Sequence, residues 1–145
     1  MLNRISIQGR LVADPELGQT KSGREYARFR IAVDRDYVVK DDNGKPKVDK
    51  SGRKIHDTDF FRVITWGGRS KFVNDCFHKG DMIVLDGSLR SSTYTDKDGN
   101  NRSSIEIQAD NIQFGGSRRQ GGAPESRNDV VEPDEYVPED NDLPF

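Results

Sequence analysis

Five segments of this 145-residue chain alternate apolar and polar residues with a period of two. Such alternation is typical of strands that bury one face and expose the other. The segments are residues 3–12, 25–33, 57–66, 82–92 and 102–114. Asp98-Gly99 predicts a hairpin between the last two segments, and a change of parity after Ala109 predicts a β-bulge near Asp110. The pattern therefore predicts an all-β domain.

Between the third and fourth segments the apolar spacing becomes that of a short helix. Over residues 69–78, four side chains share one helical face: Phe72, Val73, Cys76 and Phe77. Lys79 and Gly80 are expected to end this helix as a cationic last turn and a left-handed cap. Five strands with one helix in this place have the element order of the OB-fold, a five-stranded Greek-key barrel, although other small barrels share much of the pattern.

A long polar loop, residues 34–56, separates the second and third segments. Within residues 40–54, six Lys or Arg side chains outnumber three Asp side chains. A loop of this composition has too few apolar side chains to bury itself. We therefore expect it to be a mobile, basic flap.

The third segment has two different faces. Phe61 and Val63 form the predicted core face, because no charge interrupts it, and this leaves Phe60, Arg62 and Trp66 exposed in a row. The polar side of the fourth segment carries a similar pair, Arg90 and Tyr94. Exposed rings beside cations suit single-stranded nucleic acid, whose bases stack and whose phosphates attract Lys and Arg. The alternative interpretation is that Trp66 plugs a barrel end and Phe60 packs under the long loop.

Several short motifs follow one another in a specific order. They are Asn3-Arg4-Ile5, Gly9-Arg10-Leu11, Asp14-Pro15-Glu16, Thr58-Asp59-Phe60-Phe61-Arg62-Val63, Trp66-Gly67, Lys79-Gly80-Asp81 and Gly87-Ser88-Leu89-Arg90. The chain ends with Asp140-Asn141-Asp142-Leu143-Pro144-Phe145. In this order and with this acidic terminus, nearly the whole chain resembles the bacterial-type single-stranded DNA-binding proteins.

The resemblance implies a non-enzymatic, cytoplasmic and nucleoid-associated protein that binds and protects single-stranded DNA in replication, recombination and repair, without sequence preference. It also implies a homotetramer of OB-folds. Four aromatic residues carry over as stacking positions: Tyr37, Phe60, Trp66 and Tyr94. The candidates for phosphate contacts are the cations of the long loop together with Arg62, Arg69, Lys79 and Arg90.

The C-terminal residues differ in composition from the rest. Residues 1–119 hold 22 Lys and Arg against 17 Asp and Glu, whereas residues 120–145 hold one Arg against 8 acids. Residues 115–145 contain four of the six prolines and no periodic apolar pattern, so we expect a flexible acidic tail behind a binding domain of residues 1–114. An apolar tip after two aspartates suits a pocket with basic walls, and the resemblance implies replication and repair proteins as partners for Asp140, Asn141, Asp142, Leu143, Pro144 and Phe145.

The remaining sequence features argue against several other classes. No run approaches 18 apolar residues, and the N-terminus lacks a signal peptide, so we expect a cytosolic protein without a membrane span. One cysteine excludes an intramolecular disulfide, and we expect no metal site and no cofactor. A catalytic thiol needs a base within hydrogen-bond reach, and on a helix His78 would point away from Cys76. Cys76 is therefore interpreted as a small core residue of the helix. Two alternatives from other classes stay open: an RNA-binding OB or cold-shock-like protein, and a nuclease. Within the family, the sequence does not distinguish a chromosomal protein from a phage-encoded or DNA-uptake paralogue.

Overall fold

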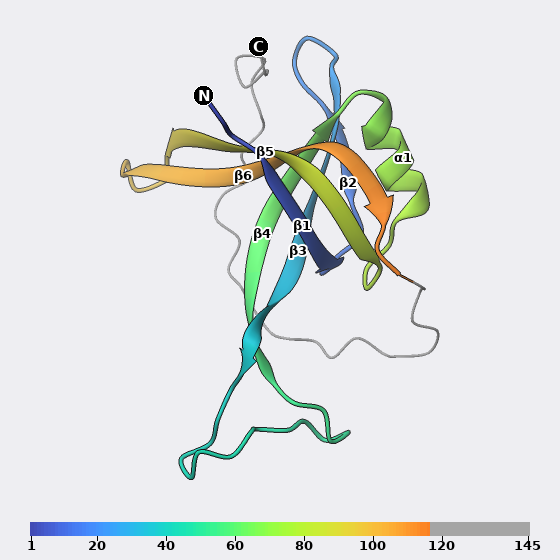
Figure 1. Cartoon of the computed structure of the whole chain (residues 1–145). Helices are drawn as coiled ribbons and strands as arrows, with labels where there is room; N and C mark the ends of the chain where they lie inside the picture. Colours follow the sequence, from blue (N-terminus) through green and yellow to red (C-terminus); the bar gives the residue numbers. More distant parts are fainter. Residues whose placement is uncertain (117–145) are drawn as a thin grey trace.

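The computed structural model describes residues 1–116, which form one barrel with a helix and a long projecting loop (Figure 1). The elements are β1 (Ile5–Leu11), β2 (Glu16–Gln19), β3 (Glu25–Val38), β4 (His56–Trp66), α1 (Gly68–Cys76), β5 (Met82–Thr95) and β6 (Asn101–Phe114). The five predicted strands and the helix are confirmed. The predicted flexible tail and its terminal motif lie outside the described residues, except for Gly115 and Gly116.

Five of the strands close into a barrel. The pairs are β1–β5, β5–β6, β6–β4, β4–β3 and β3–β1, and only β4–β6 is parallel. The barrel closes where Arg10 and Leu11 of β1 pair with Ala32 and Ile31 of β3. Since α1 connects the third and fourth barrel strands, this is the predicted OB-fold. The extra strand β2 pairs with β3 alone and was not predicted.

The core lies inside the barrel, with the helix over one end. Val63 is 1% exposed and Phe61 packs against the core from a half-buried position, which confirms the predicted inner face of β4. Val73 and Phe77, one helical turn apart, are fully buried. The other large buried side chains come from four of the barrel strands: Leu11, Phe29, Ile31, Ile83, Leu85 and Ile107.

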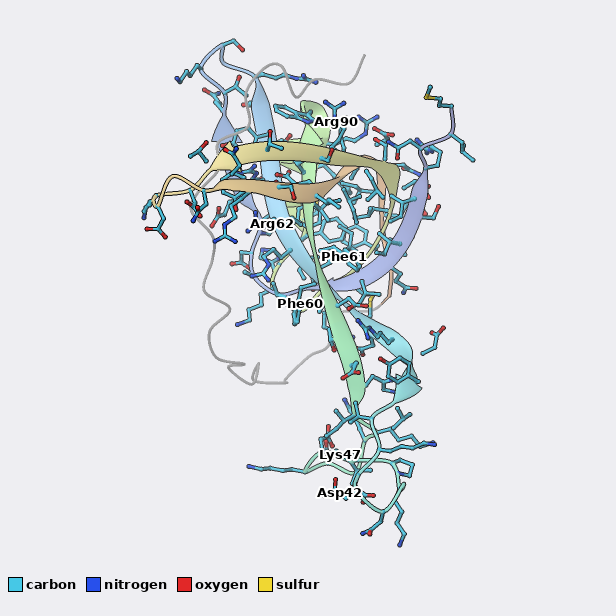
Figure 2. The ribbon with its side chains drawn as sticks, turned by 90° about the vertical axis from the view of Figure 1, so that its left-hand side faces the viewer. Asp42, Lys47, Phe60, Phe61, Arg62 and Arg90 are labelled. Atoms are coloured by element: carbon cyan, nitrogen blue, oxygen red, sulfur yellow. The ribbon has the colours of Figure 1, made fainter. Side chains whose placement is uncertain are left out.

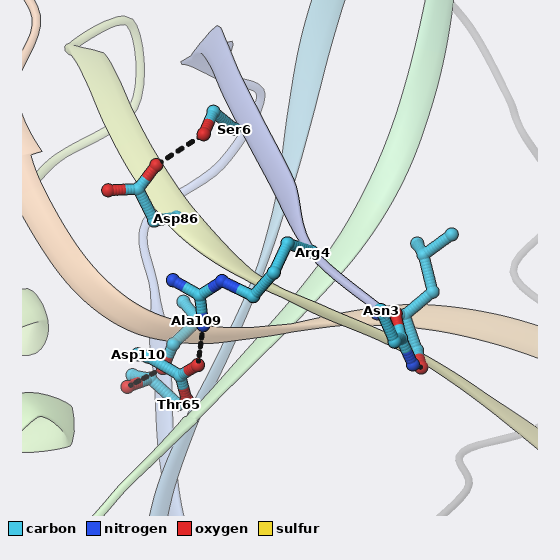
Figure 3. Close-up of polar contacts among 8 residues, drawn as sticks. Asn3, Arg4, Ser6, Thr65, Asp86, Ala109 and Asp110 are labelled. Carbon is cyan, nitrogen blue, oxygen red and sulfur yellow. Dashed lines mark hydrogen bonds and ion pairs between the residues drawn. The ribbon is translucent and has the colours of Figure 1, made fainter. Parts of the chain in front are cut away.

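The predicted β-bulge is present at Asp110. Asp86 pairs with Asn111 and Gly87 with Ala109, so Asp110 has no partner across the ladder. Its carboxylate accepts a hydrogen bond from Arg4 Nη1 at 2.9 Å, as Figure 3 shows. A Cβ atom on Gly87 would lie 1.9 Å from the Gln108 carbonyl oxygen, so the close approach of β5 and β6 at the bulge requires glycine.

Three details of the helix and the loop differ from the predictions. The helix ends at Cys76, and Gly80, with φ 90°, lies in the following turn rather than at the cap. Cys76 is exposed, so its assignment to the core is wrong: only the Val73 and Phe77 side of this short helix reaches the barrel. The strands also extend further than predicted, to Val38 and from His56, and therefore shorten the loop. Within the described part of the chain, no helix is long and apolar enough to cross a membrane.

Candidate nucleic-acid interface

The outer surface of β3, β4, β6 and β5 carries a row of arginines. Arg30 pairs with Arg62, Arg62 with Glu106, and Glu106 with Arg90, so the four side chains follow one line across four strands. Strand alternation places Arg28 on the same surface, two residues from Arg30. We call this surface, defined by Arg28, Arg30, Arg62 and Arg90, the arginine face; Figure 2 labels two of its members, Arg62 and Arg90.

The charges of the arginine face are only partly neutralised. Glu106 is 8% exposed, and its Oε1 lies 3.1 Å from Nη2 of Arg28. Arg30, Arg62 and Arg90 form no ion pair with any of residues 1–116. These three half-buried arginines therefore carry positive charge that no ion pair neutralises, and this charge attracts phosphate groups.

Phe60 lies on the outer surface of β4, next to this row. Its side chain is 43% exposed, which confirms the predicted exposure. The Arg30 guanidinium lies 5.7 Å from its ring centroid, so an unpaired cation and an open aromatic ring share one location. This combination fits one nucleotide, with the base on the ring and the phosphate at the guanidinium.

Trp66 is at the end of the same strand but is 7% exposed, so the prediction that it is exposed is wrong. Two side chains cover it, one from the neighbouring strand β3 and one from the turn before that strand. Tyr26 contacts it edge-on with 5.7 Å between ring centroids, and the Arg24 guanidinium lies 4.4 Å from the ring centroid. Its position on the outer surface is as predicted, because Trp66 pairs with Tyr26 and follows Phe60 and Arg62 in parity.

Tyr37, near the end of β3, is 53% exposed and its hydroxyl group is fixed by a polar network. The hydroxyl accepts a hydrogen bond from Arg35 at 2.8 Å and donates one to Asp57 at 3.0 Å. Arg35 also binds both carboxylate oxygens of Asp59, at 2.9 and 2.8 Å. This contact lowers the pKa of Asp59 and raises the pKa of Arg35. The network holds an open ring in one position, which reduces the entropy lost on stacking.

Of the other predicted site residues, Tyr94 follows the alternation of the arginine face, whereas Arg69 and Lys79 lie elsewhere. Tyr94 is half-buried on β5 opposite Arg102, in the same alternation as Arg90. Arg69 lies on α1 and Lys79 between α1 and β5, so neither belongs to the row of arginines. Arg28 and Arg30 were missed as site residues. Their signal was available, because the predicted inner face of the second segment, with Ala27, Phe29 and Ile31, places both arginines outside.

The projecting loop, residues 39–55, has a regular hydrogen-bonded backbone. Val39 N–H donates to Ile55, Ile55 N–H donates to Lys47, and Lys47 N–H donates to Val39, at 2.8 to 2.9 Å. Three segments therefore meet at one junction, from which two tight turns extend. All six cations of residues 40–54 are exposed, and Figure 2 shows Lys47 well away from the barrel. We call residues 39–55 the three-way loop.

A repeated turn motif shapes this loop and two other places. In residues 20–24, 41–45, 49–53 and 96–100, a first Thr or Asp is followed at the fourth position by a glycine with positive φ. In each turn, the glycine N–H donates to the first residue's carbonyl, and that residue's side-chain oxygen accepts the fifth N–H. The hydrogen bond from the Arg53 backbone is the main reason that the pKa of Asp49 is lowered. The last of these turns was predicted, as the hairpin at Asp98-Gly99, but the repeat itself was missed, although it was readable in the sequence as turn chemistry.

Comparison with known proteins agrees with this geometry. The model of the single-strand binding protein family matches residues 2–115. The single-stranded DNA-binding protein of Fusobacterium nucleatum is 32% identical over 125 residues, covering 86% of this chain and 74% of that protein. Single-stranded DNA-binding protein A of Bacillus subtilis is 32% identical over 123 residues, covering 85% of this chain and 64% of the relative. A Staphylococcus aureus single-stranded DNA-binding protein is 34% identical over 114 residues, covering 79% of this chain and 65% of that protein. This chain belongs to the single-strand binding protein family.

Proposed function

We propose that this protein binds single-stranded DNA on the arginine face, without sequence preference and without catalysing a reaction. The observation that carries the proposal is the cross-strand row of Arg30, Arg62 and Arg90 beside the exposed ring of Phe60. Guanidinium groups contact phosphates and rings contact base faces, and neither contact reads the edge of a base. The family and the names of its relatives support DNA over other single strands.

The proposal is tested by fluorescence anisotropy of labelled strands. Oligo-dT, mixed-sequence DNA, oligo-rU and a DNA duplex of equal length are titrated in the same buffer. We expect tight binding of both DNA single strands and weak binding of the duplex, whose base faces are stacked within the helix. Tighter binding of oligo-rU than of oligo-dT would favour the RNA-binding alternative, and shortening of the labelled strand would show nuclease activity.

We also propose that the protein acts as a homotetramer. Leu89 and Ile105 are 44% and 66% exposed, although they lie in the alternation of the buried Ile107. Large apolar side chains gathered on one surface suit contact with another copy. Light scattering should give four times the chain mass of 16.4 kDa. A monomeric mass would contradict the proposal.

Residues 1–114 are, in this proposal, the DNA-binding domain, and residues 115–145 the acidic tail. The tip, residues 140–145, recruits replication, recombination and repair proteins in the cytoplasm, at the nucleoid. Phe145→Ala changes no charge, so it should reduce recovery of these proteins from a bacterial lysate while DNA affinity stays the same. Equal recovery by the full-length protein, the variant and a chain ending at residue 139 would show that the tip recruits nothing.

A further inference from the structure

The ring of Trp66 is almost entirely covered in the free protein. With 7% of its side chain exposed, no face is open to a base, although stacking needs a full ring face. A base therefore reaches Trp66 only if a covering side chain moves.

Of the two side chains that cover the ring, Tyr26 is the more firmly held. Its ring packs against Gly18 of β2, where an added Cβ would lie 2.7 Å from Tyr26 Cζ. It also contacts Trp66 edge-on, and the Arg28 guanidinium lies 5.8 Å from its ring centroid. Moving Tyr26 would therefore disturb the pairing of β2 with β3.

Arg24 is held differently. Its backbone is fixed in the turn of residues 20–24, because its N–H donates to Thr20 Oγ1 and its carbonyl accepts from the Thr20 N–H. Its guanidinium group makes no hydrogen bond or ion pair with any of the described residues, and its one recorded contact is the Trp66 ring, 4.4 Å from the centroid. The side chain can therefore leave while the turn stays in place.

A second observation points to a ligand at the same place. The Nε1 atom of Trp66 is buried and has no hydrogen-bond acceptor among residues 1–116. Buried donors are normally paired, so this one calls for an acceptor that residues 1–116 do not supply. Carbonyl and phosphate oxygens of a nucleic acid strand are suitable acceptors.

We infer that the Arg24 guanidinium occupies a base-stacking position on Trp66 in the free protein and exchanges it for a base of the bound strand. The inference rests on the proposed function. A guanidinium group is planar and stacks on an aromatic face as a base does, so the two compete for one position. The displaced cation is then free to contact a phosphate, which links opening of the ring to strand binding.

The first test uses the free protein and needs no DNA. The chain has one tryptophan, so acrylamide quenching of its fluorescence reports on Trp66 alone. Arg24→Ala should raise the quenching constant by roughly twofold or more, because it opens one face of a planar ring. Arg24→Lys, which keeps the charge without the planar group, should give an intermediate value. Lys21→Ala, in the same turn, is the matched control and should change nothing. An unchanged constant in folded Arg24→Ala would overturn the inference.

The second test separates the inference from the proposed function. Binding of oligo-dT is measured by anisotropy of the labelled strand, and Trp66 fluorescence is measured in the same samples. Wild type and Arg24→Ala should reach the same strongly quenched level at saturation, since a base stacks on the ring in both. If wild type binds DNA without quenching while Arg24→Ala is quenched, Arg24 stays on the ring and the inference fails, but DNA binding stands. If anisotropy does not rise for either protein, the proposed function fails and the inference fails with it.

Discussion

Replacing Phe60 with alanine should weaken strand binding without unfolding the barrel. The ring is 43% exposed on the outer surface of β4, so its removal leaves no cavity in the core. It offers a stacking surface for one base, and such a stack is worth about 1–3 kcal/mol by alanine substitution. Since about 1.4 kcal/mol corresponds to a tenfold change, the dissociation constant should rise by roughly 5- to 150-fold. The loss of the Arg30–Phe60 contact, 5.7 Å from guanidinium to centroid, should cost little stability at this exposed site.

The assay is anisotropy of a labelled oligo-dT at fixed salt, with far-UV circular dichroism as the check on folding. Phe72→Ala is the matched control, because Phe72 is 39% exposed but lies on α1, away from the arginine face. We expect a near wild-type dissociation constant for this control. Equal affinities of wild type and folded Phe60→Ala, or equal losses for Phe60→Ala and Phe72→Ala, would refute the assignment of the strand to the arginine face.

Three further predictions concern charge, pH and packing. Arg62→Gln should reduce the slope of log affinity against log salt by about 0.7, as expected for one lost phosphate contact, whereas Lys71→Gln on α1 should leave the slope unchanged. The hydrogen bond from Arg35 lowers the pKa of Asp59 in the folded protein. The ion pair therefore contributes fully to stability above the unfolded pKa of about 3.9, and this contribution is lost as pH falls through the lower pKa of the folded state. The Tm of Asp59→Asn should therefore lie below that of wild type at pH 6, and the difference should shrink as pH falls below the unfolded pKa of about 3.9. A difference that does not change with pH would contradict this. Gly87→Ala should destabilise the barrel by about 1–3 kcal/mol or more in urea unfolding, because the new Cβ would overlap the Gln108 carbonyl, whereas Gly68→Ala, with open space around it, should cost far less.

Local patterns in the sequence were sufficient to predict the barrel. Strand alternation is local, and it identified the five barrel strands, the inner face with Val63 and the bulge at Asp110. The strand β2 was not predicted, because it has only four residues and its one large apolar side chain, Leu17, is 46% exposed. An edge strand of this kind carries no alternation to detect.

The candidate site was predictable in outline but not in its contacts. Parity placed Phe60 and Arg62 outside correctly, and it would have placed Arg30 beside them. It did not predict the burial of Trp66, because Tyr26 and Arg24 reach this ring from a segment about 40 residues away in the chain. The junction of the three-way loop depends in the same way on non-local hydrogen bonds between Val39, Lys47 and Ile55.

Photo-cross-linking locates the strand on the barrel most directly. An oligonucleotide that carries a photoreactive pyrimidine is irradiated with the full-length protein, and the adducts are mapped by mass spectrometry. Exposed aromatic residues occur both on the arginine face and beside α1, so adducts can form in either place. We expect adducts at Phe60 on the arginine face, and at Trp66 once Arg24 is displaced. Adducts concentrated at Phe72 of α1 and at Phe114, which contacts it, would place the strand beside the helix instead of on the arginine face and would contradict the proposal.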